Sequence, residues 1–416
     1  MNGLDTKTLI NEIKTAITGN MDLSKELPDD EMKEHIIKAV FEKSRQCYID
    51  MGRKHHIVEV VFNSIRGLGI LQPVLDDETV TEIMLNGHNN IFIERMGKVE
   101  KLDIAFESKE KLEDVIQSII SRANRTVNEY NPIVDARLAD GSRINVVLYP
   151  IALNGPIVTI RKFPGKPLTI EQLIKFGSLT EEAGEALCSL VRARYNIFIC
   201  GGTGSGKTTF LNALSNFIPS DERIITIEDS AELQITGIEN IVRMETRNTN
   251  TEGKGEITIR DLIKTSLRMR PERIIVGEVR GPEALDMLQA MNTGHDGSLS
   301  TGHANSPADM LSRLETMVLT AAPLPLEAIR QQIASAIDII IHLSRMRDKS
   351  RKVLEITEVT GYSEGRINLN KLFEFEELES SCIDKSERNA VEGVLKRTGN
   401  RVVNTYKFKR AGIAGF

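Results

Sequence analysis

The chain has 416 residues, of which 40% are hydrophobic and 27% are charged, and it carries a formal net charge of −6. This length exceeds what one compact core usually holds, so we expect two or three domains. The acidic balance argues against broad electrostatic binding to nucleic acid, which is therefore not an expected partner. No run of about 18 uncharged apolar residues predicts a membrane span. The first residues also lack the basic and apolar regions of a signal peptide, and we expect a cytoplasmic protein.

Residues 1–70 are predicted to form an N-terminal helical segment. Apolar side chains recur at helical spacing in residues 31–41 and 56–62, and this pattern stops at Gly67 and Gly69. The sequence leaves the role of this segment open, and packing against the next domain is the default expectation.

Residues 71–163 are predicted to form a smaller α+β domain. Ser108 is expected to cap a helix, because apolar residues follow it at intervals of three and four. Strand-like runs occupy residues 90–95, 99–102, 144–148 and 157–160. Residues 164–167 contain two prolines and a glycine and are the expected linker.

Residues 168–416 are predicted to form a second, larger domain. Helical and apolar strand-like segments alternate along it, which is typical of an α/β fold with a largely parallel sheet and helices on its faces. The strand-like runs after Arg345 are expected to extend this sheet with an antiparallel edge.

Residues 201–208 match the whole Gly-x-x-x-x-Gly-Lys-Thr pattern and are called the glycine-rich loop below. An apolar strand-like run precedes the loop and a helical run follows it, which is the context that a phosphate-binding loop requires. Lys207 is expected to contact the β and γ phosphates of a nucleoside triphosphate, and the Thr208 hydroxyl to bind Mg²⁺. The expected ATP-binding residues are Gly202, Thr203, Gly204, Ser205, Gly206, Lys207, Thr208 and Thr209.

Two apolar runs that follow the loop end in carboxylates. Residues 223–229 end in Glu228 and Asp229, and residues 273–278 end in Glu278. Ligands of open α/β sheets bind beyond the carboxyl ends of the strands, so these side chains are expected near the nucleotide. Glu278 is the best candidate for the base that activates the attacking water.

Residues 294–303 place two histidines among small polar residues. His295 and His303 are candidate sensors of the γ phosphate. The chain has no Asn-Lys-x-Asp sequence of the kind that reads guanine, because residues 370–373 break that pattern at its last position. ATP is therefore the expected nucleotide.

Four longer segments resemble the secretion-superfamily ATPases of type II and type IV secretion, and most closely the CpaF/TadA branch that powers tight-adherence (type IVc) pili. They are residues 80–87, 135–145, 160–163 and 267–281. The resemblance implies a RecA-like ATPase domain and a hexameric ring. It also implies that Glu228 lies in an acidic "Asp box", that Glu278 ends a Walker B strand, and that His295 and His303 bound a "His box".

The same resemblance implies that arginines of the first domain reach phosphates at a domain or subunit boundary. Arg143 and Arg161 are the favoured residues, and Arg137 is a further candidate. Gly277 stands where many phosphate-loop ATPases place an aspartate linked to magnesium. Magnesium is therefore expected to depend on Thr208 and on water-mediated contacts to the carboxylates.

Together with the nucleotide-binding residues, the resemblance implies an ATP-hydrolysing motor at the cytoplasmic face of a membrane, with Mg²⁺ as cofactor. It is expected to drive pilus assembly, with retraction left open, by pushing on inner-membrane platform proteins. Two alternatives remain open. The first is a conjugation-type ATPase for nucleic-acid transfer. The second is a regulatory module whose nucleotide-bound state signals to a partner.

Overall fold

The computed structural model describes residues 6–20, 28–45, 49–65, 68–95, 97–123, 125–138, 140–163, 165, 167–247, 249, 254–378 and 391–416. The chain divides into two compact units, Met1–Gly165 and Lys166–Phe416. Residues 164 and 166 of the predicted linker lie outside the described residues. None of the helices within the described ranges is both long and apolar enough to span a bilayer.

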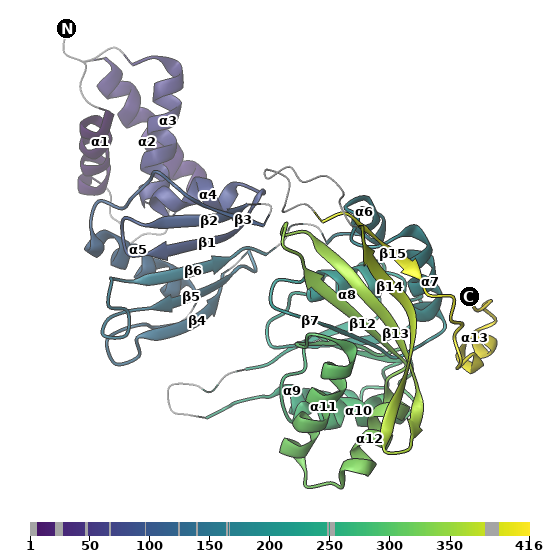
Figure 1. The fold of residues 1–416 in the computed structure, drawn as a ribbon. Helices are drawn as coiled ribbons and strands as arrows, with labels where there is room; N and C mark the ends of the chain where they lie inside the picture. Colours follow the sequence, from purple (N-terminus) through teal and green to yellow (C-terminus); the bar gives the residue numbers. More distant parts are fainter. Residues whose placement is uncertain are drawn as a thin grey trace. The chain divides into compact units, whose positions relative to one another are not determined.

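The first unit begins with three helices, drawn in purple in Figure 1. They are α1 (Thr6–Asn20), α2 (Asp29–Ser44) and α3 (Met51–Ile65), and they bury one apolar stripe each against a shared core. Helical structure then continues past residue 70, through η1 (Gly69–Leu71) and α4 (Gln72–Asp76). Pro73 is compatible with α4 because it lies in the first turn, where a missing N–H costs nothing.

An antiparallel six-stranded sheet forms the rest of the first unit, with the strand order β3-β2-β1-β6-β5-β4. The helix α5 (Lys109–Arg122) is capped as predicted, since Lys111 N–H donates to the Ser108 hydroxyl at 3.3 Å. The strand-like runs predicted at residues 90–95 and 99–102 are β2 and β3, which pair as an antiparallel hairpin. The strands are β1 (Val80–Asn86), β2 (Ile91–Arg95), β3 (Lys98–Lys101), β4 (Ile133–Arg137), β5 (Arg143–Val147) and β6 (Ile157–Arg161).

The second unit contains a nine-stranded sheet with the order β15-β14-β13-β12-β7-β11-β10-β8-β9. The strands from β12 to β9 in this order are parallel to one another, which confirms the predicted α/β fold. These parallel strands are β7 (Ile197–Gly201), β8 (Ile224–Glu228), β9 (Ile241–Glu245), β10 (Arg273–Val276), β11 (Leu299–Gly302) and β12 (Ile339–Arg345).

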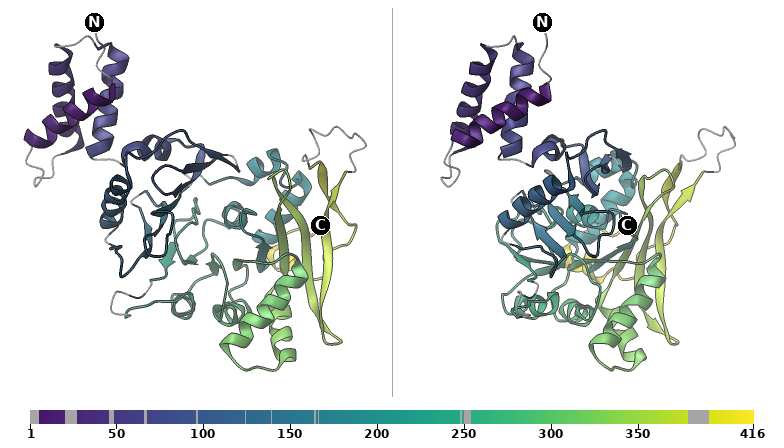
Figure 2. Two further views of the ribbon diagram at one scale, coloured as in Figure 1. Left: turned by 60° about the vertical axis from the view of Figure 1, so that its left-hand side comes forward. Right: turned by 90° about the vertical axis from the view of Figure 1, so that its left-hand side faces the viewer.

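The sheet continues past β12 with the antiparallel strands β13 (Arg351–Ser363), β14 (Arg366–Glu377) and β15 (Gly393–Arg397). This confirms the antiparallel edge expected after Arg345. The long strands β13 and β14 appear in yellow-green in Figure 2. The small helix α13 (Tyr406–Ala411) follows near the end of the chain.

Helices cover both faces of the parallel strands (Figure 1). Along β7, Ile197 and Ile199 enter the core on one face, while Phe198 and Cys200 enter the core on the other. A strand buried on both faces reads as a continuous apolar run, which is why this segment shows no alternation. The first core includes α6 (Ile170–Lys175), α7 (Glu181–Arg192) and α8 (Lys207–Ser215), and the second includes α9 (Ile259–Ser266), α10 (Glu283–Asn292), α11 (Pro307–Ala321) and α12 (Leu326–Ala336).

A buried ion pair ties the amino end of the parallel strands together. The Arg273 side chain is fully buried, and its Nε and Nη2 donate to both Glu222 carboxylate oxygens at 2.6 and 2.7 Å. Nη1 donates to the Val191 carbonyl at 2.7 Å. The pair therefore links the residues before β8 and the start of β10 to the C-terminal turn of α7.

Replacing Glu222 with alanine is expected to destabilise the second unit by about 3–5 kcal/mol, because Arg273 would remain buried without its carboxylate. The free energy of unfolding, measured with urea, tests this. Glu376→Ala is the matched control, since its partner Lys396 and Glu376 itself are both more than half exposed, and it should cost less than about 1 kcal/mol. Equal effects of the two substitutions would contradict the prediction.

Candidate functional site

The parallel pairing brings the ends of four strands to one edge of the sheet. Ile275 of β10 pairs with Thr226 of β8 and with Leu299 of β11, and Leu299 pairs in turn with Ile197 of β7. Each strand then runs two to five residues further to a polar segment. The glycine-rich loop and the side chains of Glu228, Glu278 and His303 therefore meet at the same edge.

The glycine-rich loop joins β7 to the N-terminus of α8. Gly204 and Gly206 have φ values of +71° and +92°, which only glycine adopts without strain. Lys207 is 8% exposed, and its ammonium group donates to the Gly201 and Gly202 carbonyls at 3.1 and 3.0 Å. Thr208 and Thr209 lie in the first turn of α8, where backbone N–H groups and the helix dipole favour an anion.

Lys207, His303 and Glu278 form a continuous chain of contacts at this edge. His303 Nδ1 lies 3.4 Å from Lys207 Nζ, and His303 Nε2 lies 2.7 Å from Glu278 Oε1. Burial, followed by the positive charge of Lys207, lowers the pKa of His303, so its ring is neutral near pH 7. A neutral imidazole between a cation and a carboxylate can exchange partners without a large charge penalty.

Arg280 joins two carboxylates that follow β8 and β10 in the chain. Its Nη2 donates to Glu278 Oε2 at 2.6 Å, and its Nη1 lies 3.7 Å from Asp229 Oδ2. Glu283 fixes the backbone beneath it, accepting from the N–H groups of Arg280 and Gly281. Sequence reasoning left Arg280 out of the site, and its position two residues after Glu278 was the available signal.

Glu228 faces inward and its carboxylate is already held by the backbone. The side chain is buried, and its Oε1 accepts from the N–H groups of Glu232 and Leu233 at 2.9 and 3.0 Å. A Cβ at position 277 would lie 2.9 Å from Glu228 Cγ. Glu228 thus occupies the space beside Gly277, which explains why position 277 carries no side chain.

The two candidate histidines lie at opposite ends of β11. His303 follows the carboxyl end of the strand, whereas His295 precedes its amino end and its Nδ1 lies 3.2 Å from the Ala290 carbonyl. The structure therefore brings His303, and not His295, to the glycine-rich loop.

The three candidate arginines form a row in the first unit. Arg137 of β4 pairs in register with Arg143 of β5, and Arg143 pairs with Arg161 of β6. Directly opposite residues of antiparallel strands project from the same face, so the three side chains share one face. Like charges in such positions repel one another. Glu82 of β1 pairs in register with Arg161 and places a carboxylate at the end of this row.

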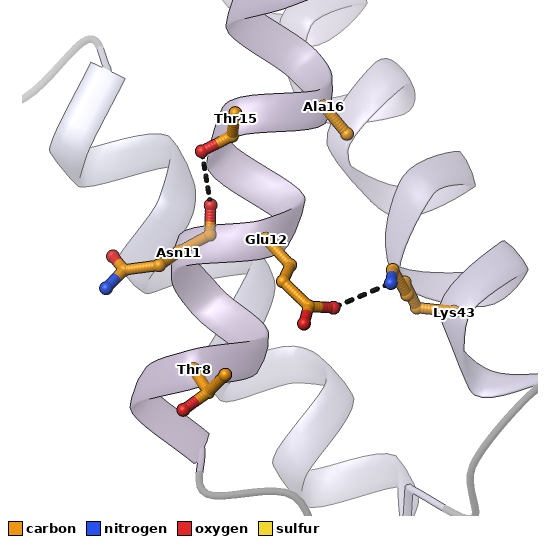
Figure 3. A pocket seen from close by; sticks show the side chains of 6 residues that line it. All are labelled: Thr8, Asn11, Glu12, Thr15, Ala16 and Lys43. Atoms are coloured by element: carbon orange, nitrogen blue, oxygen red, sulfur yellow. Dashed lines mark hydrogen bonds and ion pairs between the residues drawn. The ribbon is translucent and has the colours of Figure 1, made fainter.

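Grooves occur in both units. One groove of about 530 Å³ opens beside the glycine-rich loop, lined by Gly202, Thr203, His303, Ala304, Asn305, Asp309, Ser312, Arg313 and Thr316. Another, of about 670 Å³, lies between α1 and α2 and is shown in Figure 3. Glu12 and Lys43 form an ion pair of 2.6 Å at this second groove, and its other lining residues are Thr8, Asn11, Thr15 and Ala16. These six lining residues do not form an arrangement that could carry out catalysis.

Residues 65–411 match the protein family described as "Type II/IV secretion system protein". The chain is 33% identical over 316 residues to a conjugal transfer protein of Mycobacterium tuberculosis, covering 74% of this chain and 89% of that one. It is also 33% identical over 300 residues to the type IV secretion system protein VirB11 of Brucella suis, covering 66% and 83% of the two chains.

A solved structure of the pilus retraction motor PilT with bound ADP has the same fold. It aligns with a TM-score of 0.53 at 20% identity, over 83% of this chain and 87% of that one. The family match spans both the arginine row and the edge that holds the glycine-rich loop. The chain belongs to the type II/IV secretion system ATPase family.

Proposed function

We propose that this protein hydrolyses ATP and works as a hexameric motor for a tight-adherence pilus of the CpaF/TadA type. Its motor would act on inner-membrane platform proteins from the cytoplasmic face of the membrane. The observation that carries most weight is the contact chain from Lys207 through His303 to Glu278 beside the glycine-rich loop. It connects the group that would hold the γ phosphate with the group that would activate water.

Glu278 is the proposed general base. Its Oε1 is buried and accepts no well-directed hydrogen bond from the described residues, although His303 Nε2 is near. Once His303 moves away, this oxygen can accept a proton from an attacking water. Arg280 holds the other carboxylate oxygen, which fixes the direction in which Oε1 points.

His303 is the proposed γ-phosphate sensor, and Lys207 the proposed phosphate cation. When a phosphate draws the Lys207 ammonium away from the Gly201 and Gly202 carbonyls, the contact of Lys207 with His303 must change as well. The change reaches Glu278 through the same ring. Nucleotide occupancy and the position of the base are thereby coupled.

Mg²⁺ is the proposed cofactor, bound together with ATP at this edge. The Thr208 hydroxyl is the proposed direct ligand, and Glu228, Asp229 and Glu278 are the carboxylates proposed to contact the ion through water. Glu228 is held by two backbone N–H groups, so it would orient such a water without moving. When bound, the ion neutralises charge on the phosphate oxygens.

Arg143 and Arg161, with Arg137 beside them, are proposed to complete the site of a neighbouring subunit. A guanidinium at the γ phosphate stabilises the charge that develops during hydrolysis and can be worth three or more decades of rate. If another subunit supplies the guanidinium, ATP is hydrolysed only when the two subunits close on each other. Hydrolysis is thereby coupled to movement between subunits.

Glu278→Gln is expected to lower kcat for ATP about 100-fold or more, because the amide cannot accept the proton of the attacking water. Affinity for ADP should remain near that of the unaltered chain. Phosphate release and ADP binding are the measurements, and the exposed Glu376→Gln is the control. If pili still form while hydrolysis is lost, the motor is excluded and the nucleotide-gated regulatory module is favoured.

Mixtures of Arg143→Ala and Lys207→Ala chains are expected to regain ATP turnover, although each variant alone is inactive. In a mixed ring, an intact loop on one subunit meets an intact arginine from its neighbour. Mixtures of Lys207→Ala with Glu278→Gln are the control and should stay inactive, because both residues belong to one unit of one chain. Failure of the first mixture, with mixed rings demonstrated by mass, would show that Arg143 acts within its own chain.

A conjugation-type motor is the second candidate, since the Mycobacterium tuberculosis relative is named as a conjugal transfer protein. For the pilus motor we expect DNA or RNA to leave ATP turnover unchanged at low salt, in keeping with the net charge of −6. A salt-sensitive rise in turnover on adding single-stranded DNA would favour the conjugation-type motor instead.

A further inference from the structure

A basic hairpin from a distant part of the chain lies against the glycine-rich loop. Leu343 of β12 pairs in register with Gly201, the last residue of β7. The backbones are so close here that a Cβ at position 201 would collide with the Leu343 carbonyl oxygen. The turn that follows β12 therefore runs alongside the loop that follows β7.

Two arginines at the base of this hairpin reach the loop. Arg351 Nε donates to the Gly204 carbonyl at 3.1 Å, across 147 residues of sequence. A Cβ at position 206 would lie 3.6 Å from Arg351 Cδ, and one at position 204 would lie 3.7 Å from Arg345 Nη1. Both side chains thus border the two glycines whose positive φ values shape the loop.

The hairpin is held in one shape by its own turn. Asp348 Oδ1 accepts from the Ser350 N–H at 2.9 Å and from the Ser350 hydroxyl at 2.6 Å. Met346 N–H donates to the Ser350 carbonyl at 2.8 Å. A short, hydrogen-bonded turn fixes where the flanking arginines begin, so little entropy is lost when they bind a ligand.

Two further cations of the hairpin have other partners. Arg347 pairs with Glu377 of β14, and Lys352 Nζ donates to the Gly177 carbonyl at 2.7 Å. Arg345 and Arg351 are the pair that concentrates positive charge at the loop.

This charge lies on the opposite side of the loop from the proposed base. In the sheet order, β12 borders β7 on one side and β11 borders it on the other. Glu278 and His303 follow β10 and β11, on the side where the γ phosphate is expected. The β12 side of the loop is therefore where we expect the diphosphate part of the nucleotide, which remains after hydrolysis.

We propose that Arg345 and Arg351 bind the diphosphate part of the nucleotide within the same chain, an inference that rests on the proposed nucleotide site. Arg345 contacts phosphate oxygens directly, since guanidinium groups form strong charge-assisted hydrogen bonds with them. Arg351 is a positioning residue that holds the Gly204 carbonyl outward, so that the neighbouring N–H groups face the phosphates. This pair serves ADP and ATP alike, whereas Arg143 and Arg161 serve the γ phosphate.

The test is MgADP binding by calorimetry to the full chain, with Arg345→Ala and Arg351→Ala compared with Arg347→Ala. Each of the first two is expected to raise the Kd for ADP about ten-fold or more, while Arg347→Ala leaves it unchanged. Arg345→Lys should recover part of the loss because it restores the charge. The Kd should also depend less steeply on salt in Arg345→Ala, which a purely structural defect would not cause.

Arg351→Gln separates the two roles, because it keeps a donor for the Gly204 carbonyl and removes the charge. Arg351→Gln should bind ADP more tightly than Arg351→Ala. If the alanine variant does not fold, the ADP affinity of Arg351→Gln is compared with that of Arg347→Ala instead. ADP affinities of Arg345→Ala and Arg351→Ala equal to that of Arg347→Ala would overturn the inference. Undiminished binding by Lys207→Ala would overturn the proposed nucleotide site itself, and with it this inference.

Discussion

The parallel pairing of β8, β10, β11 and β7 is the constraint on which the site depends. Side chains alternate along a strand, so a slip of one residue in any pairing would turn Glu228 or the residues around Glu278 to the other face. Thr226 opposite Ile275 places Glu228 level with Gly277. Leu299 opposite Ile197 places the end of β11, and hence His303, beside the glycine-rich loop. The cores on both faces of the sheet fix this register.

The two edges of the same strands have different tasks. At the amino edge, Arg273 and Glu222 form a buried, closely paired ion pair with extra hydrogen bonds to backbone carbonyls. At the carboxyl edge, Lys207, His303, Glu278 and Arg280 share a partly exposed network in which contacts can be exchanged. Paired, buried charges hold one geometry, whereas a network of alternatives can respond to an arriving phosphate.

Arginines take part in the proposed site in two ways. Arg345 and Arg351 lie beside the loop within one chain, and their position follows from the pairing of β12 with β7. Arg137, Arg143 and Arg161 are aligned by the sheet of the first unit, in a row of like charges. In the proposed motor, the first set retains the diphosphate and the second makes hydrolysis depend on a neighbour. With such a division, each subunit could keep its nucleotide bound while its neighbour in the ring determines when ATP is hydrolysed.

The sequence by itself determined the elements whose signals are local. The glycine-rich loop, the buried strands that end at Glu228 and Glu278, and the helix capped by Ser108 are all visible in short windows of residue types. Tertiary structure alone decided which polar groups meet. It separated His295 from His303 by the length of β11, filled the space at Gly277 with Glu228, and brought Arg351 to Gly204 across 147 residues. Periodicity reports how one segment folds, but strand order and register arise from packing among segments far apart in the chain, which no local window contains.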